Sequence, residues 1–118
     1  MDDSLLSVCI IAKNEEKLLA QCLESVAQVA GEIILVDTGS TDGTCAIASR
    51  YGCRILQHPW NNDFSDARNV ALAAARLPWI LSIDADERLL DPASIHDTLS
   101  AAGPNVGGIL IEVISYSM

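Results

Sequence analysis

The sequence predicts an α/β fold, a three-layer and doubly wound sheet that is mostly parallel, with helices on both faces. Two observations lead to this prediction. Apolar, β-branched segments alternate along the chain with segments whose apolar residues recur at helical spacing. The apolar segments are hydrophobic at nearly every position, as expected for strands that are covered on both faces. Alternation of this kind is typical of parallel sheets.

The first strand and helix are predicted between residues 5 and 31. Leu5–Ala12 is apolar and β-branched, which is typical of a strand. Asn14 is expected to cap the following helix, because its side chain accepts a hydrogen bond from an unsatisfied backbone N–H. Helical spacing continues to Gly31, and glycine is common just after a helix end.

The second strand and helix are predicted to follow directly. Glu32–Val36 is nearly all apolar and predicts a buried strand. Ser40 is expected to cap the second helix, which Gly52 closes. Arg54–Gln57 predicts a short third strand.

The rest of the chain predicts two further helices and two further strands. Phe64–Arg76 is an alanine-rich helical segment, and Trp79–Ile83 predicts the fourth strand. Asp91-Pro92 is typical of a helix start, so a helix is expected to Leu99. Gly107–Tyr116 predicts a fifth strand. Because no closing helix follows it, we expect residues 1–118 to be a single but truncated domain.

Composition excludes several classes of protein. Half of the 118 residues are hydrophobic, which argues against disorder. The formal charge of −9 argues against a nucleic-acid partner, since phosphates require basic surface. No apolar run approaches the roughly 18 residues of a membrane span. The start of the chain also lacks the basic region of a signal peptide. A cytoplasmic protein is therefore expected.

Four cysteines occur at positions 9, 22, 45 and 53. They form no C-x-x-C pair, and each lies in an apolar stretch. Buried free thiols are therefore expected in place of disulfides or zinc ligands.

Asp84-Ala85-Asp86 is the most informative motif, because it directly follows the apolar fourth strand. Residues two apart in extended chain point to the same side, so both carboxylates are expected to meet. Mg²⁺ is usually held by one or two carboxylates together with substrate phosphate oxygens. A divalent cation, Mn²⁺ or Mg²⁺, would compensate the repulsion between the two charges. The plainer interpretation is a strand followed by a solvated acidic turn.

Other polar residues are predicted at the same edge of the sheet. The first strand ends at Ala12-Lys13-Asn14-Glu15, and the second strand ends at Asp37. Ligands of open parallel sheets bind outside the carboxyl ends of the strands. The Asp37 carboxylate is expected to face this crevice, where it would accept a hydrogen bond from a base N–H or a sugar hydroxyl.

Arg68 and two aromatic residues complete the candidate set. Arg68 is either a surface arginine or a cation that approaches a diphosphate. Trp60 and Phe64 are expected to pack, although both are placed to line a pocket. Trp79 is expected in the core.

Taken together, these segments resemble the family 2 glycosyltransferases of the GT-A fold. The resemblance rests on four segments in order, Ser7–Glu16, Glu32–Thr44, Trp60–Asn69 and Trp79–Glu87. It covers nearly all of residues 5 to 90, and the four motifs are specific as a set.

The resemblance implies a nucleotide-diphosphate sugar donor, an acceptor that remains unknown, and a divalent cation. It places Ala12, Lys13 and Asp37 around the base and ribose, and Arg68 near the base or diphosphate. It makes Asp86 a more direct metal ligand than Asp84. The resulting nucleotide-sugar-binding residues are Ala12, Lys13, Glu15, Asp37, Arg68 and Asp84, and the metal ligands are Asp84 and Asp86.

The part of the family that carries the general base normally follows this region. About thirty residues follow Asp86, and Glu112, which lies in a predicted strand, is a poor candidate. We therefore expect the donor-binding half of a glycosyltransferase domain, which binds nucleotide but transfers sugar poorly or not at all.

Three alternatives remain at this point. Asp37-Thr38-Gly39 also matches the aspartic proteases, although those proteins are almost wholly β. The motif Asp84-Ala85-Asp86 also matches haloacid-dehalogenase-type phosphatases, whose nucleophile strand normally opens the domain. A non-catalytic module that binds nucleotide or dimerises through an open sheet edge is the third alternative.

Overall fold

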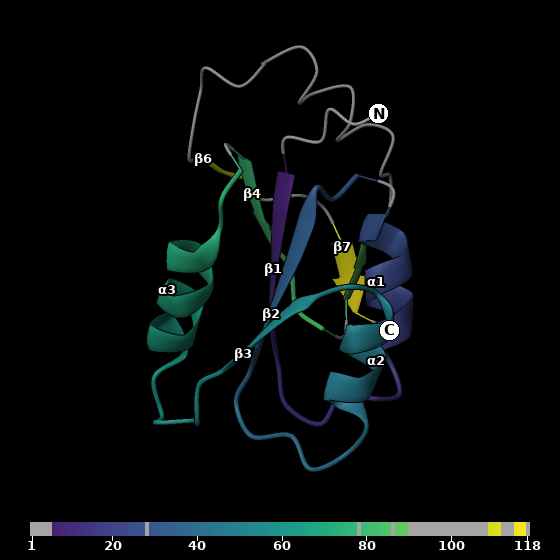
Figure 1. The fold of residues 1–118 in the computed structure, drawn as a ribbon, viewed down its shortest axis with the longest axis vertical. Coiled ribbons are helices and arrows are strands. Elements are labelled where there is room, and N and C mark those ends of the chain that lie inside the picture. The colour runs from purple at the N-terminus through teal and green to yellow at the C-terminus, as the bar shows by residue number, and fades with distance from the viewer. Residues whose placement is uncertain are drawn as a thin grey trace.

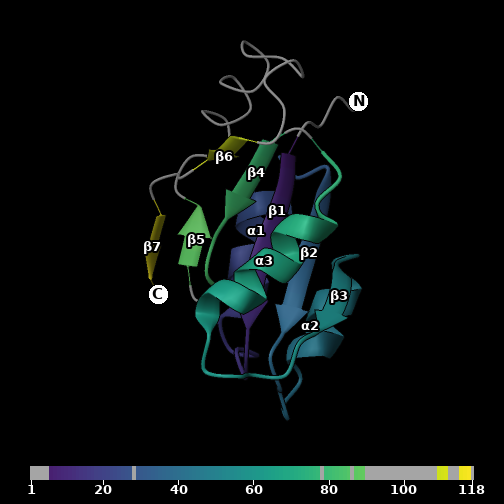
Figure 2. The same cartoon turned by 90° about the vertical axis from the view of Figure 1, so that its left-hand side faces the viewer.

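The computed structural model describes residues 6–27, 29–77, 79–85, 87–89, 109–111 and 115–117. It confirms the α/β fold, with a parallel sheet between helices (Figures 1 and 2). In chain order the elements are β1 (Leu6–Ala12), α1 (Leu19–Ala27), β2 (Glu32–Asp37), α2 (Thr44–Arg50), β3 (Arg54–Gln57), α3 (Phe64–Ala74), β4 (Trp79–Ser82), β5 (Glu87–Leu89), β6 (Ile109–Ile111) and β7 (Ser115–Ser117).

The main sheet has the strand order β3-β2-β1-β4-β6, and every neighbouring pair in it is parallel. From β1 the chain proceeds outward to β2 and β3, and it then returns to β4 on the other side of β1. The strand order therefore reverses between β1 and β4. In open parallel sheets, ligands bind at the carboxyl ends of the strands next to such a reversal.

Strand β1 is covered on both faces, and its side chains alternate between two cores. Leu6, Val8 and Ile10 pack with apolar residues of α1. Cys9 packs instead with alanines of α3, and its thiol lies 3.7 Å from the carbonyl oxygen of Ala71. Figure 1 shows α3 on one side of the sheet and α1 and α2 on the other. The three predicted layers are confirmed, and the aspartic-protease alternative, which requires an almost wholly β protein, is wrong.

The helices begin later or end earlier than the sequence indicates. Asn14 does not cap α1, because its φ of 55° is left-handed and the helix begins only at Leu19. Helix α2 begins at Thr44, whose backbone N–H donates to the Asp42 carboxylate, so Ser40 is not its cap. Helix α3 ends at Ala74, because the next residue is extended. The described part of the chain has no helix long and apolar enough to cross a membrane.

The C-terminal region differs from the prediction of one fifth strand. Two strands lie within that region, and they belong to different sheets. Strand β6 joins the main sheet beside β4, whereas β7 pairs in antiparallel fashion with β5, a strand that was not predicted. The predicted helix from Asp91 to Leu99 lies outside the described residues.

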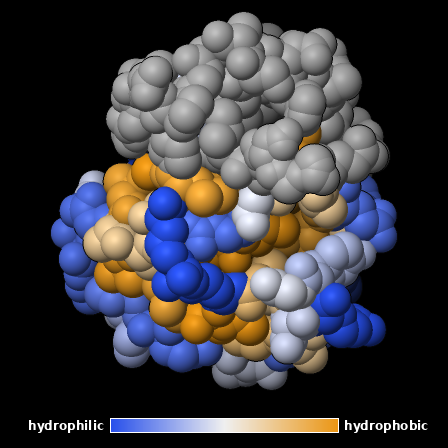
Figure 3. Space-filling view, turned by 45° about the horizontal axis from the view of Figure 1, so that its top comes forward, coloured by the Kyte–Doolittle hydropathy of each residue, from blue (hydrophilic) through white to orange (hydrophobic). Residues whose placement is uncertain are grey.

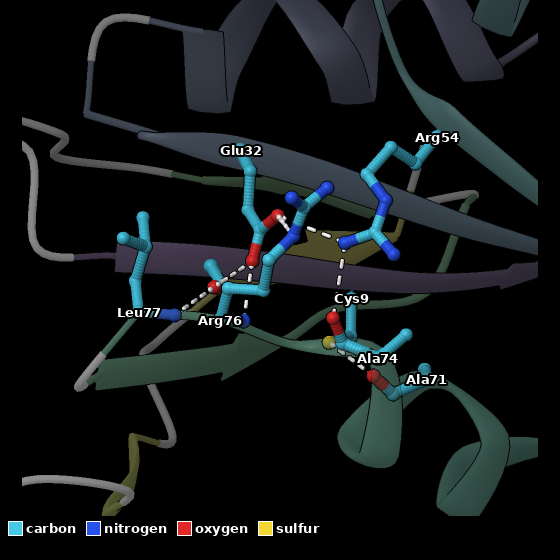
Figure 4. A network of polar contacts seen from close by, with 8 residues as sticks. Cys9, Glu32, Arg54, Ala71, Ala74, Arg76 and Leu77 are labelled. Atoms are coloured by element: carbon cyan, nitrogen blue, oxygen red, sulfur yellow. Dashed lines mark hydrogen bonds and ion pairs between the residues drawn. The ribbon is translucent and has the colours of Figure 1, made fainter.

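Glu32 joins several elements at the amino ends of the strands (Figure 4). Its carboxylate accepts hydrogen bonds from the Ser7 hydroxyl, from Arg54 Nη1 at 3.1 Å and from the Arg76 backbone N–H at 2.7 Å. Burial alone would raise the pKa of Glu32, but these hydrogen bonds outweigh it and hold the pKa below its usual range. Figure 3, which looks toward this end of the sheet, shows strongly hydrophilic side chains lying across hydrophobic surface.

Two loops at the opposite end of the sheet are joined by reciprocal hydrogen bonds. The Asn14 N–H donates to Ser40 Oγ at 2.9 Å, and the Thr41 N–H donates to Asn14 Oδ1 at 2.8 Å. The Glu15 N–H donates to Thr44 Oγ1 at 2.8 Å. The loop after β1 is therefore held against the loop after β2.

A second reciprocal pair of hydrogen bonds, made by Glu16, reinforces the connection between the two loops. The Glu16 carboxylate accepts from the Gly43 N–H at 2.7 Å, and the Glu16 N–H donates to Asp42 Oδ2 at 3.3 Å. Hydrogen bonding from the Thr44 hydroxyl lowers the pKa of Asp42. We call this set of bonds, made by residues 14–16 with residues 40–44, the loop clamp.

We expect Glu32→Gln to lower the free energy of unfolding at pH 7 by about 1.5–3 kcal/mol, the range for hydrogen bonds to charged groups. A carboxyl group with a depressed folded-state pKa stabilises the fold above its unfolded pKa, and this contribution is lost as the pH falls through the folded value. The urea unfolding curves of the two proteins should therefore begin to converge as the pH falls below the ordinary glutamate pKa of about 4.3, and they should coincide only below the lower folded-state pKa. Glu24→Gln, at an exposed carboxylate of α1, is the control and should change little. An equal effect of the two substitutions would contradict the role given to Glu32.

We expect Thr44→Val to loosen the loop clamp, because the buried hydroxyl is the acceptor for the Glu15 N–H. The loss should be about 1–2 kcal/mol in the free energy of unfolding. Amide exchange measured by NMR should accelerate at Glu15 relative to Leu23 in the core of α1. Thr44→Ser retains the hydroxyl and is expected to keep the Glu15 amide protected. Unchanged protection in Thr44→Val would refute the clamp.

Candidate functional site

The loops that follow β1, β2 and β3 lie together at the carboxyl end of the sheet. They form the lower end of the molecule in Figures 1 and 2. In the register of the sheet Ala12 is paired with Asp37, so the ends of β1 and β2 are level. The segment after β4 lies on the other side of β1, since the Ile83 N–H donates to the Cys9 carbonyl. The predicted convergence of polar strand ends is therefore present in the fold.

A pocket of about 270 Å³ opens between these loops. This volume is close to the lower end of the range for small-molecule sites, about 300–1,000 Å³. Three of the predicted binding residues line it, together with three that were not predicted to bind. The lining residues are Ile11, Ala12, Lys13, Glu15, Thr38 and Trp60.

Lys13 and Glu15 bring opposite charges to the pocket. The Lys13 side chain is exposed, and Glu15 is partly exposed. Both are placed by the left-handed Asn14 between them, which turns the chain sharply after β1. The loop clamp holds the Glu15 backbone through Thr44. A cation and a hydrogen-bond acceptor are thus held on a rigid loop at the pocket.

Asp37 is placed differently from the prediction. The residue is only 3 % exposed, and both carboxylate oxygens lie within hydrogen-bond distance of the Ser40 N–H, at 3.2 and 3.3 Å. It therefore shapes the loop after β2 from beneath, and the next residue, Thr38, lines the pocket in its place. Burial and the nearby Asp37 carboxylate raise the pKa of the Cys45 thiol. A direct contact between Asp37 and a ligand stays a prediction.

Asp84 lies two residues after the end of β4. Its side chain is exposed, whereas its neighbours Ile83 and Ala85 are 4 % and 2 % exposed. Its carbonyl oxygen lies 3.6 Å from the Cys22 thiol of α1, so the backbone is attached to the helix layer. This in-out alternation agrees with two carboxylates on one side, but Asp86 itself lies outside the described residues.

A divalent cation fits the chemistry of Asp84. Among the residues that the structure describes, no three His, Cys, Asp or Glu side chains form a group that could hold a metal. Such a group is not required when a substrate supplies phosphate oxygens, since one or two carboxylates then suffice for Mg²⁺. An exposed carboxylate beside the strand reversal provides this kind of oxygen ligand.

Arg68 lies in the second turn of α3, on the helix that packs against β1 and β2, and its side chain is partly exposed. The helix begins at the carboxyl end of the sheet, where Asp63 caps it by accepting from the Asp66 N–H. The Asp66 carboxylate is occupied by its neighbours, His58 at 3.1 Å and the Asn61 side chain at 2.7 Å. The loop before α3 is therefore ordered by its own contacts.

Trp60 does not pack in the interior, and this expectation was wrong. It is 46 % exposed and lines the pocket, whereas Trp79 is 8 % exposed and lies in the core as expected. The side chain of Phe64 is outside the described part of the chain. Trp60 follows Pro59 in the loop after β3, and pocket lining, the alternative position that the sequence indicated for it, is the one observed. The rule that groups strand ends at one edge would also have identified Thr38, which follows β2.

The expectation for the cysteines holds for two of the four. Cys9 and Cys22 are buried free thiols, while Cys45 and Cys53 are partly exposed. Burial raises the pKa of Cys9 and of Cys53 to about 11. Neither group is a thiolate nucleophile at neutral pH.

A larger cavity of about 400 Å³ lies at the opposite, amino end of the sheet. Glu32, Arg54 and Arg76 line it, and these charges already pair with one another. The carboxyl end is the better candidate site because the strand reversal and the exposed Asp84 both lie there.

Comparison with known proteins shows the family to which the chain belongs. The family model "Glycosyl transferase family 2" matches residues 7–116. A TPR repeat-containing protein of Synechococcus elongatus is 49% identical over 85 residues, which cover 72% of this chain and 21% of that protein. The lipopolysaccharide core biosynthesis glycosyltransferase LpsC of Rhizobium meliloti is 43% identical over 89 residues, which cover 71% of this chain and 32% of that protein.

A solved structure gives the same result for the fold. Glucosyl-3-phosphoglycerate synthase of Mycobacterium tuberculosis, crystallised with Mn²⁺, uridine diphosphate and glucosyl-3-phosphoglycerate, superposes with a TM-score of 0.61 and 28% identity. The match covers 70% of this chain and 33% of that one. The chain thus spans about a fifth to a third of the length of these relatives. Its fold is of the GT-A type, and the chain belongs to glycosyl transferase family 2.

Proposed function

We propose that the 118 residues act as one domain, the donor-binding half of a metal-dependent glycosyltransferase. The donor would be a nucleotide-diphosphate sugar, and transfer of a hexose to an acceptor would require residues beyond those described. The observation that carries the proposal is the exposed Asp84 beside the strand reversal, with the pocket of Lys13 and Glu15 one strand away.

The donor would lie across the carboxyl ends of the strands. Its base and ribose would occupy the pocket at the ends of β1 and β2, against the Ala12 and Lys13 backbone. Glu15 would accept a hydrogen bond from the base or ribose. Asp37 would support the end of β2 beneath this pocket, and its carboxylate would also contact the nucleotide. Arg68 would approach the diphosphate from α3, where a guanidinium gives bidentate contacts.

Asp84 and Asp86 would hold a divalent cation together with the diphosphate oxygens. When bound, the cation would supply Lewis-acid stabilisation of the charge that develops on the leaving diphosphate. The chain's own contribution is to hold the carboxylates beside β1 through buried Ile83 and Ala85. The glucosyl-3-phosphoglycerate synthase structure contains Mn²⁺ and uridine diphosphate, which supports this choice of ligand.

The general base is not assigned, because the part of the family that carries it normally follows this region; Glu112, a poor candidate, lies outside the described residues. Nucleotide binding without sugar transfer would favour the alternative of a non-catalytic module. The haloacid-dehalogenase alternative is not supported, since the strand before Asp84 is the fourth of the chain and the family model is that of a glycosyltransferase. A cytoplasmic location and assembly through an open sheet edge stay predictions.

We expect Asp84→Asn to weaken binding of uridine diphosphate in the presence of Mn²⁺. The affinity measured by calorimetry should fall by about 10-fold or more, because even changes to residues around the metal ligands cost about 10–100-fold in metal affinity. Without Mn²⁺, wild type and Asp84→Asn should bind equally weakly, since the carboxylate acts through the cation. Glu24→Gln removes one exposed carboxylate from α1 and serves as the charge-matched control. Equal binding by wild type and Asp84→Asn with Mn²⁺ present would refute this role.

A further inference from the structure

Trp60 is the large hydrophobic side chain that the described residues leave exposed, at 46 %. A single exposed apolar side chain is common and requires no function by itself. This one differs because Trp60 lines the pocket at the carboxyl end of the sheet. Pockets that bind small molecules are lined mainly by apolar and aromatic side chains.

Two hydrogen bonds position Trp60, one made by its backbone and one made by its indole. The Trp60 N–H donates to the Thr38 carbonyl at 3.3 Å, which ties the loop after β3 to the end of β2. The indole Nε1–H donates to Asn62 Oδ1 at 3.2 Å. Asn62 adopts a left-handed φ of 67°, a conformation that asparagine tolerates better than most residues. The ring is therefore placed before any ligand arrives.

These contacts restrict what the indole can offer a ligand. A tryptophan side chain has one hydrogen-bond donor and no acceptor. Because Asn62 already accepts from that donor, the ring presents only its aromatic surface to the pocket. The ligand group that suits such a surface is flat and aromatic or apolar.

The order of strands indicates which part of a nucleotide would meet this ring. Trp60 follows β3 and Asp84 follows β4, and β2 and β1 lie between them. The Trp60 backbone N–H donates to the Thr38 carbonyl, and Trp60 lines the pocket with Ile11 and Ala12, so it lies at the ends of β1 and β2, on the side away from β4. With the diphosphate at Asp84, the far end of the ligand is the base.

We propose that the indole of Trp60 stacks on the nucleobase of the donor and is a binding residue of this site. The proposal rests on the proposed function, since it assumes that a nucleoside diphosphate occupies the carboxyl end of the sheet. It adds a residue on the loop after β3 to a site otherwise built by the ends of β1, β2 and β4. It also predicts that base recognition here depends on an aromatic face, in addition to hydrogen bonds from the pocket.

The test compares wild type, Trp60→Leu and Trp60→Phe by calorimetry with Mn²⁺ present, in the full 118-residue chain. The ligands are inorganic pyrophosphate and whichever of UDP, CDP, ADP and GDP binds wild type most tightly. Trp60→Leu should weaken the nucleotide by about 10-fold or more, as removal of a base-stacking aromatic does elsewhere. Pyrophosphate has no base, so its affinity should not change. Trp60→Phe keeps a ring and should retain most of the binding.

Fluorescence gives an independent readout, because the chain contains two tryptophans, of which Trp79 is buried. In Trp79→Phe, the nucleotide should quench the remaining emission of Trp60. In Trp60→Phe, the emission of Trp79 should not respond. Thermal unfolding of each variant checks that the fold is intact.

The outcomes separate this proposal from the one on which it rests. If Trp60→Leu binds the nucleotide as wild type does, the stacking proposal is wrong and the proposed function stands. A parallel loss of pyrophosphate would also overturn stacking, since it indicates general damage to the site. If wild type binds neither nucleotide nor pyrophosphate, both proposals fail.

Discussion

The pairing of β1 with β2 on one edge and with β4 on the other is the constraint on which the rest of the fold depends. A strand in this central position has its backbone hydrogen bonds satisfied on both edges, so both of its faces must be covered by helices. The same pairing requires the chain to leave β1 in one direction and to return on its other side. That return creates the strand reversal, and the pocket and Asp84 lie on either side of the end of β1.

Charge is distributed unequally between the two ends of the sheet. At the amino end, Arg54 and Arg76 are both paired with the buried Glu32 carboxylate. At the carboxyl end, Lys13 is exposed at the pocket. A chain with a net charge of −9 repels a diphosphate over most of its surface. This explains physically why a donor site here would combine local cations with a divalent metal.

The loop clamp and the Trp60 contacts show where local sequence rules were insufficient. Asn14 has the side chain of a helix cap, but its oxygen accepts from Thr41 of another loop, and its own backbone is left-handed. Ser40 was expected to cap the second helix, but its hydroxyl accepts from the Asn14 N–H, and the helix begins only at Thr44. In both cases the side chain bonds a residue of another loop, 26 or 27 residues away in the chain. Helix-capping preferences describe hydrogen bonds between a side chain and the neighbouring backbone, so they could not identify contacts between two loops.

The sequence was sufficient to predict β1 to β4, the α/β class and the edge of the sheet at which Asp37 and Asp84 lie, but not β5. It could do so because apolar periodicity is a property of neighbouring residues and is readable without coordinates. The tertiary structure decided which residues share the pocket, with Thr38 and Trp60 lining it and Asp37 beneath it. It also divided the C-terminal segment between β6 and β7. These outcomes depend on strand order and on contacts between loops, which join residues far apart in the chain and leave no periodic signal in it.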